Sequence, residues 1–173
     1  MTPGEIQEVA SALNVLRPDD HAMSMWIGAL TGGDYKTGQG VLRSADDEYD
    51  PFGVLAVINH AEWTWSDLDQ GWGVGDTAMA LDAKTIAKWL DVPSHEQMRG
   101  TDLMKRVKDF QDLVLRLSDS GVALSEIGEL LRQGIARAAE ERLRQNSTRY
   151  ESVVGIGSSV NTRSLHPFYG KRR

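Results

Sequence analysis

Hydrophobic residues recur at helical spacing along most of the chain. Residues 4–16 place apolar side chains three or four positions apart, and Pro18 ends that pattern because a proline disfavours helix at the residue before it. A second short helix is expected after Asp19, ending at Gly32. The pattern therefore predicts that the chain begins with two helices.

The next predicted helix starts at Asp50, because an aspartate can cap free backbone amides and Pro51 occupies a first-turn position that needs no donor. It should run to about His60 and be buried on all sides, with Gly53 allowing a neighbouring backbone to approach closely. A short helix should then open at Asp82.

The clearest periodicity lies in the second half of the chain. Apolar residues spaced four, three, four and three positions apart predict a packed helix: Leu103, Val107, Phe110, Val114 and Leu117. A turn at residues 118–121 separates this seam from a second one, formed by Leu124, Ile127, Leu131, Ile135 and Ala138. Together the two seams predict a C-terminal helical hairpin.

Two stretches lack the helical period. Residues 34–49 combine glycines with an acidic turn and predict a small β-hairpin, the only sheet that we expect. Residues 63–75 are rich in tryptophan and glycine and are interpreted as a long loop, a feature that is uncommon unless it is functional or packed by its own side chains.

These patterns predict a single compact domain that is mainly α (α+β). The expected domain covers residues 1–147 and carries the small β-hairpin and the C-terminal helical hairpin, and residues 148–173 are expected to form an extended basic tail or arm. A chain of 173 residues is long enough to bury one sizeable core.

The sign of the net charge changes at the same boundary, between residues 147 and 148. The net charge is −6, but the tail holds five basic residues and one acid, a net of +4, which leaves −10 on the body. An acidic body disfavours nucleic-acid binding, and the three consecutive charges of Lys171, Arg172 and Arg173 make polyanion binding by the tail only a weak alternative.

The tail also carries the apolar side chains Leu165, Phe168 and Tyr169, which a purely solubilising tail would not need. These three residues, with Lys171, Arg172 and Arg173, are therefore candidates for docking the tail on its own body, on a neighbouring subunit or on a partner. A mobile terminus is the competing interpretation.

Composition excludes several kinds of chemistry. The chain has no cysteine, so thiolate zinc sites, disulfides and cysteine nucleophiles cannot operate, and its four histidines are scattered without metal-ligand spacing. We expect no catalytic residues, no metal and no cofactor. No apolar run reaches the length of a membrane span and the N-terminus does not resemble a signal peptide, so the expected location is the cytoplasm.

Two groups of residues are candidates for a protein interface. The acidic residues Asp46, Asp47 and Glu48 lie in the predicted hairpin, where Asp34 and Asp50 are close in sequence. The second group, Trp63, Trp65 and Trp72, lies in the predicted loop, and aromatic clusters beside acids are a common form of binding hot spot. A solvated acidic rim and a loop attached to the body by its tryptophans are the simpler alternatives.

Several short segments form an ordered pattern along the chain: Trp26 to Tyr35, Gly38 to Leu42, Phe52 to Leu55, Met79 to Leu90, and Leu115 to Ile127. This pattern resembles an uncharacterised family of small proteins of tailed bacteriophages and prophages, with the motifs W-x-x-A-L-x-S-G-x-Y, C-C-L-G-V-L-C and L-N-D-x-G-x-S-F-x-E-I-A. The cysteines of that motif fall on Asp50, Pro51 and Ala56, so any thiol role is lost in this chain.

The resemblance implies a phage or prophage setting but no activity. Our leading hypothesis is a non-enzymatic protein that binds a host or defence protein in the cytoplasm of the infected bacterium, through the acidic residues and the tryptophans. The alternative is a virion structural or accessory protein whose C-terminal arm docks on a neighbouring subunit. An enzyme or small-molecule-binding module ranks third.

Overall fold

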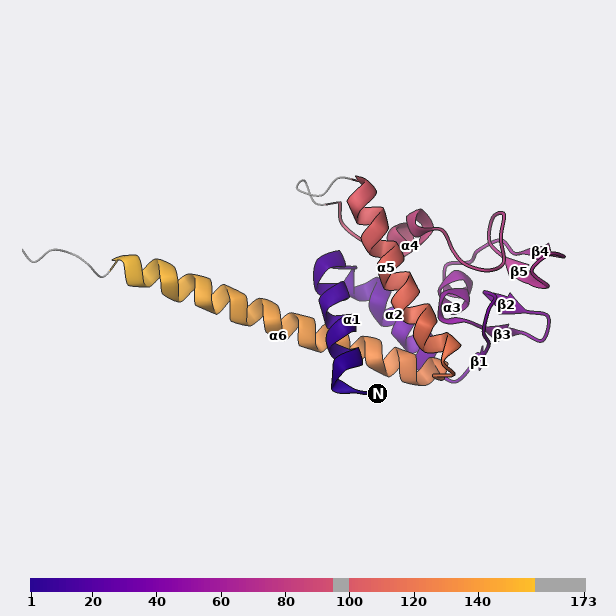
Figure 1. Ribbon diagram of the computed structural model, residues 1–173, viewed down its shortest axis with the longest axis horizontal. Helices are drawn as coiled ribbons and strands as arrows, with labels where there is room; N and C mark the ends of the chain where they lie inside the picture. Colours follow the sequence, from indigo (N-terminus) through magenta and orange to yellow (C-terminus); the bar gives the residue numbers. More distant parts are fainter. Residues whose placement is uncertain (95–99, 158–173) are drawn as a thin grey trace, which may run out of the picture. The chain divides into compact units, whose positions relative to one another are not determined.

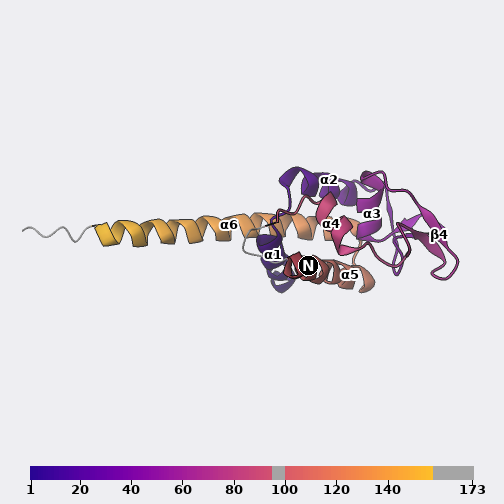
Figure 2. The same ribbon diagram turned by 90° about the horizontal axis from the view of Figure 1, so that it is seen from above.

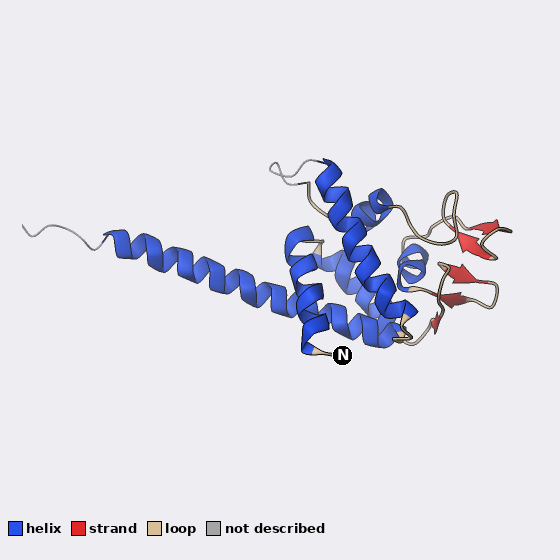
Figure 3. Cartoon of the chain, viewed as in Figure 1, coloured by secondary structure: helices blue, strands red, loops and turns tan. Residues whose placement is uncertain are grey.

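The computed structural model describes residues 1–94 and 100–157, and the chain divides into two units, Met1–Glu140 and Glu141–Arg173. The fold is mainly helical with a small sheet (Figure 3). The helices are α1 (Pro3–Leu16), α2 (Asp20–Thr31), α3 (Pro51–Ile58), α4 (Ala83–Trp89), α5 (Gly100–Asp119) and α6 (Leu124–Gly157). The strands are β1 (Lys36–Thr37), β2 (Arg43–Ser44), β3 (Glu48–Tyr49), β4 (Thr64–Ser66) and β5 (Gly71–Gly73).

The helix starts follow from local sequence. Thr2 caps α1 and exchanges hydrogen bonds with Glu5, so that two free amides of the first turn are satisfied at once. Aspartate side chains cap the next three helices by accepting from backbone amides: Asp19 at α2, Asp50 at α3 and Asp82 at α4. The helices predicted from sequence in residues 1–94 are therefore confirmed.

The core of the first unit forms where α2, α3 and α5 meet. Trp26 lies 5.3 Å from Phe52 and 6.4 Å from Phe110, measured between ring centroids, and all three side chains are buried. The Trp26 indole Nε1 also donates a buried hydrogen bond to the Pro51 carbonyl at 2.8 Å. Figure 2 shows α2 and α5 on opposite sides of this core, with α3 and α4 between them.

The predicted C-terminal seams are buried except for Ile135, which is half-buried, and a turn at Gly121, whose φ is +89°, joins their helices. The helices diverge from this turn (Figure 1). The α5 helix packs on α1 and α4, whereas α6 approaches α1 so closely that a side chain at Gly134 would collide with Val9. The two seams therefore contribute to the helical core through their contacts with α1 and α4.

The sheet is larger than the sequence predicted. Its strand order is β1-β3-β2-β5-β4, with β1 and β3 parallel and the other pairs antiparallel. The predicted hairpin supplies β1, β2 and β3, but residues 63–75, interpreted as a loop, supply β4 and β5. Three-residue strands are too short to show a reliable alternating pattern, which is why the loop interpretation was wrong.

Helix α3 connects the sheet to the helical core. At Gly53 the backbone carbonyl of Leu42 occupies the space that a Cβ atom would need, which confirms the predicted close approach. The Leu42 amide donates to the Ala78 carbonyl at 2.8 Å, and its carbonyl accepts from the Asp50 amide at 3.3 Å. This backbone network holds the strands at the end of the unit beside α3 (Figure 1).

Helix α6 continues well past the expected boundary. Residues 148–157, predicted to begin an extended tail, belong to this helix, which ends at Gly157. Residues 158–173, with the predicted docking residues of the tail, lie outside the described residues. The glycines and serines that suggested a loop lie mostly beyond Val154, and the polar sequence before them is compatible with helix.

Candidate functional site

Four side chains form one row across the sheet. Arg43 on β2 lies directly opposite Tyr49 on β3 and opposite Trp72 on β5, and Trp72 lies opposite Trp65 on β4. Directly opposed residues of neighbouring strands point to the same face of a sheet. The row Tyr49, Arg43, Trp72 and Trp65 therefore lines a single face, which we call the aromatic face.

Arg43 lies at the centre of this face. Its guanidinium carbon is 5.7 Å from the ring centroid of Tyr49 and 5.6 Å from those of Trp63 and Trp72, within the range of cation–π attraction. Burial raises the pKa of the Tyr49 hydroxyl above its ordinary value, and the nearby charge of Arg43 opposes that rise. Tyr49 therefore offers a neutral hydroxyl at neutral pH.

The aromatic rings also contact one another. Trp65 and Trp72 meet edge to face with centroids 5.4 Å apart, Tyr49 and Trp63 are 6.4 Å apart, and Tyr35 extends the group with its ring 5.4 Å from Tyr49. These rings are half-buried, and Tyr35, Tyr49 and Trp63 pack with one side against the hydrophobic core. They therefore present a pre-ordered aromatic surface that loses little conformational entropy when a partner binds.

Two of the three predicted acidic residues, Asp46 and Asp47, border the aromatic face. Oδ1 of Asp47 accepts from Nε and Nη2 of Arg43 at 2.8 and 2.7 Å, which fixes the guanidinium among the rings. Asp46 lies beside it in the turn between β2 and β3 and is exposed. Glu48 is also exposed, but as the neighbour of Tyr49 on β3 it points to the opposite face of the sheet. The structure thus places the six predicted interface residues on the strands of one sheet or directly beside them, with Glu48 on the other face.

The turn between β4 and β5 presents an apolar tip. Asp67 accepts from the Trp65 indole Nε1 at 2.9 Å, and the Asp69 carboxylate accepts from the Ala78 amide at 3.1 Å. Between these two aspartates, Leu68 is 93% exposed. The turn is held by its own hydrogen bonds, so the exposure of Leu68 is a fixed feature of the site.

Charge is concentrated in the part of the chain that builds the sheet. Residues 34–78 contain nine acidic side chains, one of them the buried Asp50, and only two basic ones, Lys36 and Arg43, a formal net charge of −7 against −6 for the whole chain. Arg43 is already paired with an acid. The aromatic face is therefore surrounded by negative charge, which attracts positively charged partners over distances near the Debye length.

Asp50 does not belong to the acidic rim with which the sequence grouped it. The residue is 2% exposed, and its Oδ1 accepts from the Gly53 amide at 2.6 Å at the start of α3. Burial raises its pKa to about 7; the amides of Gly53 and Phe52 oppose the shift, and the charge of Asp119 adds to it. Asp50 is a structural group inside the fold.

Sequence reasoning missed three members of the site: Arg43, Tyr49 and Leu68. Arg43 had no periodic pattern around it, since its strand is two residues long. A signal did exist in the other strands, because Trp63 and Trp65 are two positions apart, the spacing that places side chains on one face of a strand.

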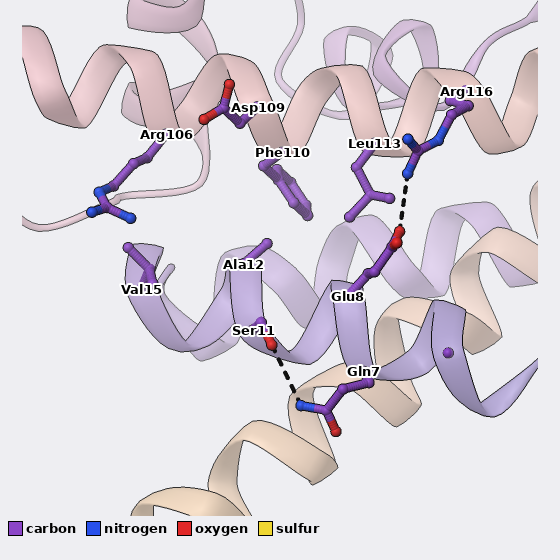
Figure 4. Close-up of a pocket in the computed structure, with 11 residues that line it drawn as sticks. Gln7, Glu8, Ser11, Ala12, Val15, Arg106, Asp109, Phe110, Leu113 and Arg116 are labelled. Carbon is purple, nitrogen blue, oxygen red and sulfur yellow. Dashed lines mark hydrogen bonds and ion pairs between the residues drawn. The ribbon is translucent and has the colours of Figure 1, made fainter.

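A second candidate is the groove between α1 and α5, with a volume of about 600 Å³. Figure 4 shows apolar side chains meeting across it, contributed by Ala12, Val15, Phe110 and Leu113. Its carboxylates are in ion pairs: Glu8 with Arg116 at 2.9 Å, and Asp109 with Lys105 at 2.8 Å. The groove is an apolar surface edged by ion pairs, and none of the predicted site residues lines it.

In residues 1–94 and 100–157, no group of three or more histidine, aspartate or glutamate side chains could hold a metal ion. In the same ranges no helix combines the length and hydropathy of a membrane span. The tail-docking candidates Leu165, Phe168, Tyr169, Lys171, Arg172 and Arg173 lie outside the described residues.

The chain matches no protein-family model, and it shows no significant similarity to a curated protein or to a solved structure. The function is therefore inferred from the site itself.

Proposed function

We propose that this protein is a non-enzymatic binding module that docks a partner protein on its aromatic face. The observation that carries the proposal is the convergence of Arg43 with Trp63, Trp65 and Trp72 on one face of the sheet. Tryptophan, tyrosine and arginine are the residue types most enriched in the hot spots of protein interfaces.

Charge specifies the chemistry of the partner. An aromatic face surrounded by acidic side chains favours a partner patch that carries lysine or arginine around an apolar centre. The apolar centre would contact Leu68 and the rings, and the basic rim would meet Asp46. Charge attraction would raise the association rate of such a partner, and the buried aromatic contacts would slow the dissociation of the complex.

The resemblance to phage and prophage proteins suggests where the protein acts. We propose that the partner is a host or defence protein in the cytoplasm of an infected bacterium. Basic surfaces are common on proteins that bind nucleic acid, and an acidic protein with an aromatic hot spot can compete for such a surface.

The test is affinity capture of the tagged full-length chain from infected cells at moderate salt. Leu68→Asp and Asp46→Lys change exposed side chains of the proposed interface, and both should stay folded. We expect a stoichiometric partner with the wild-type chain, its loss with Leu68→Asp and weaker capture with Asp46→Lys.

Met25→Asp is the matched control, because Met25 is an exposed apolar residue on α2 and receives the same substitution. It should capture the partner as well as the wild-type chain does. A partner retained equally by Leu68→Asp and by Trp72→Ala would show that the aromatic face is not the binding surface.

A further inference from the structure

The C-terminal part of α6 carries a row of exposed apolar side chains. Leu143, Tyr150 and Val153 are 68%, 73% and 68% exposed, which is unusual for large apolar residues on a helix. With Asn146 they occupy positions spaced three, four and three apart, the spacing of a coiled-coil seam. We call these four residues the α6 stripe.

The other side of the same helix is polar. Gln145, Thr148 and Ser152 project from it, and two of these residues bond back to the helix: Thr148 Oγ1 donates to the Arg144 carbonyl and Ser152 Oγ donates to the Arg149 carbonyl. This part of α6 is therefore amphipathic. A helix of this length gains most of its stability by packing an apolar face, so the stripe is expected to be covered.

Asn146 indicates what covers it. Its side-chain amide has no hydrogen-bond partner in the part of the chain that the structure describes. In the middle of an apolar seam an unpaired amide is costly, but two asparagines facing each other can satisfy one another. That pairing arises when the same helix of a second copy lies alongside in parallel and in register.

Charge supports the parallel orientation. Arg142 and Arg149 border the stripe on one side, whereas Glu140, Arg144, Ser147 and Glu151 lie toward the other side. An antiparallel pair would bring the Arg142 and Arg149 sides of both copies together. A parallel, in-register pair avoids this repulsion and places Arg142 of one copy beside the uncharged Ser147 of the other.

We propose that the protein forms a dimer through the α6 stripe, with the two helices parallel and in register. Leu143, Tyr150 and Val153 then pack against their own counterparts, and the Asn146 amides pair. The stripe and the aromatic face share no residue, so the dimer carries two copies of that face. If a partner presents repeated sites, the dimer binds it with higher avidity than a single chain.

Sedimentation equilibrium of the full-length chain over a range of concentrations tests the association. We expect a monomer–dimer equilibrium for the wild-type chain, and a dissociation constant about tenfold higher or more for Leu143→Asp and Tyr150→Asp. Gln145→Asp and Ser152→Asp introduce the same charge on the opposite side of the helix and should leave the constant within about twofold. Circular dichroism confirms that every variant is folded.

The absence of cysteine from the chain allows the orientation to be tested by single introduced thiols. In a parallel, in-register pair, Leu143→Cys should form a disulfide with itself, and so should Val153→Cys. In an antiparallel pair, a mixture of the two variants should instead cross-link Leu143→Cys to Val153→Cys. Ser152→Cys serves as the control on the far side of the helix.

A chain that stays monomeric at every concentration overturns the proposal, as does a dimer that Leu143→Asp leaves intact. Selective cross-linking between the two different cysteine variants overturns the parallel arrangement. Neither result bears on the aromatic face, because the capture experiment with Leu68→Asp tests that surface separately.

Discussion

Arg43 and Trp72 lie directly opposite each other on neighbouring strands, with the guanidinium carbon 5.6 Å from the centroid of the indole ring. Asp47 holds the same guanidinium from the other side through two hydrogen bonds to one carboxylate oxygen. The arginine therefore connects the turn between β2 and β3 to the β4–β5 hairpin. It organises the face that we propose as the binding surface.

Arg43→Ala should lower the free energy of unfolding by about 1 to 2 kcal/mol, because it removes an ion pair and the cation–π contacts with three rings. Arg43→Lys keeps the charge but not the planar group, and it should recover only part of this loss. Urea denaturation gives both values. Lys36→Ala, an exposed change on β1, is the control and should stay within about 0.5 kcal/mol of the wild-type chain.

Gly53→Ala should destabilise the fold by about 3 kcal/mol or more, because the backbone carbonyl of Leu42 occupies the space of the new methyl group and a backbone atom cannot move aside cheaply. Gly28→Ala is the matched control. It also lies inside a helix, but nothing is near its Cβ position, so this change should stabilise the protein by about 0.5 to 1 kcal/mol. Equal melting temperatures for the two variants would contradict the close approach.

Asp50 should make the fold less stable as pH rises. Its pKa is about 7 in the folded protein, above the ordinary 3.8, so between these values the folded state holds more protons than the unfolded state. The contribution of Asp50 to the free energy of unfolding is most favourable below about pH 4. It falls as the pH rises toward 7 and changes little above that. The decline should be visible in the difference between wild-type and Asp50→Asn unfolding free energies.

Asp50→Asn is the informative variant because asparagine caps a helix about as well as aspartate but does not ionise. The variant should gain stability relative to the wild-type chain as the pH is raised from 4 to 7. A difference that is constant over this range would show that the Asp50 carboxyl titrates at its ordinary pKa.

Trp26→Phe should lower the free energy of unfolding by about 1 to 3 kcal/mol, since it leaves the buried Pro51 carbonyl without its donor. Trp65→Phe removes an indole hydrogen bond of similar length, to Asp67, at an exposed site where water can replace it. Loss of that hydrogen bond in Trp65→Phe should lower the free energy of unfolding by less than about 1 kcal/mol. Thermal unfolding of the two variants side by side separates the buried bond from the exposed one.

The sequence alone determined the helices well. The seam from Leu103 to Leu117 and the caps at Asp19, Asp50 and Asp82 are encoded within a few residues of where they act. Periodicity and capping depend on near neighbours, so both can be recognised without knowledge of the fold. The same local logic identified Gly53 as a point of close approach, although not the carbonyl that it meets.

Only the tertiary structure decided the sheet and the aromatic face. Arg43 meets Trp72 through the pairing of β2 with β5, strands separated along the chain by β3, α3 and β4. Strand register between distant segments depends on the packing of the whole domain, and strands of two or three residues carry too little pattern to predict it. The sequence therefore indicated which residues could bind a partner, and the fold determined that Arg43 joins them into one surface.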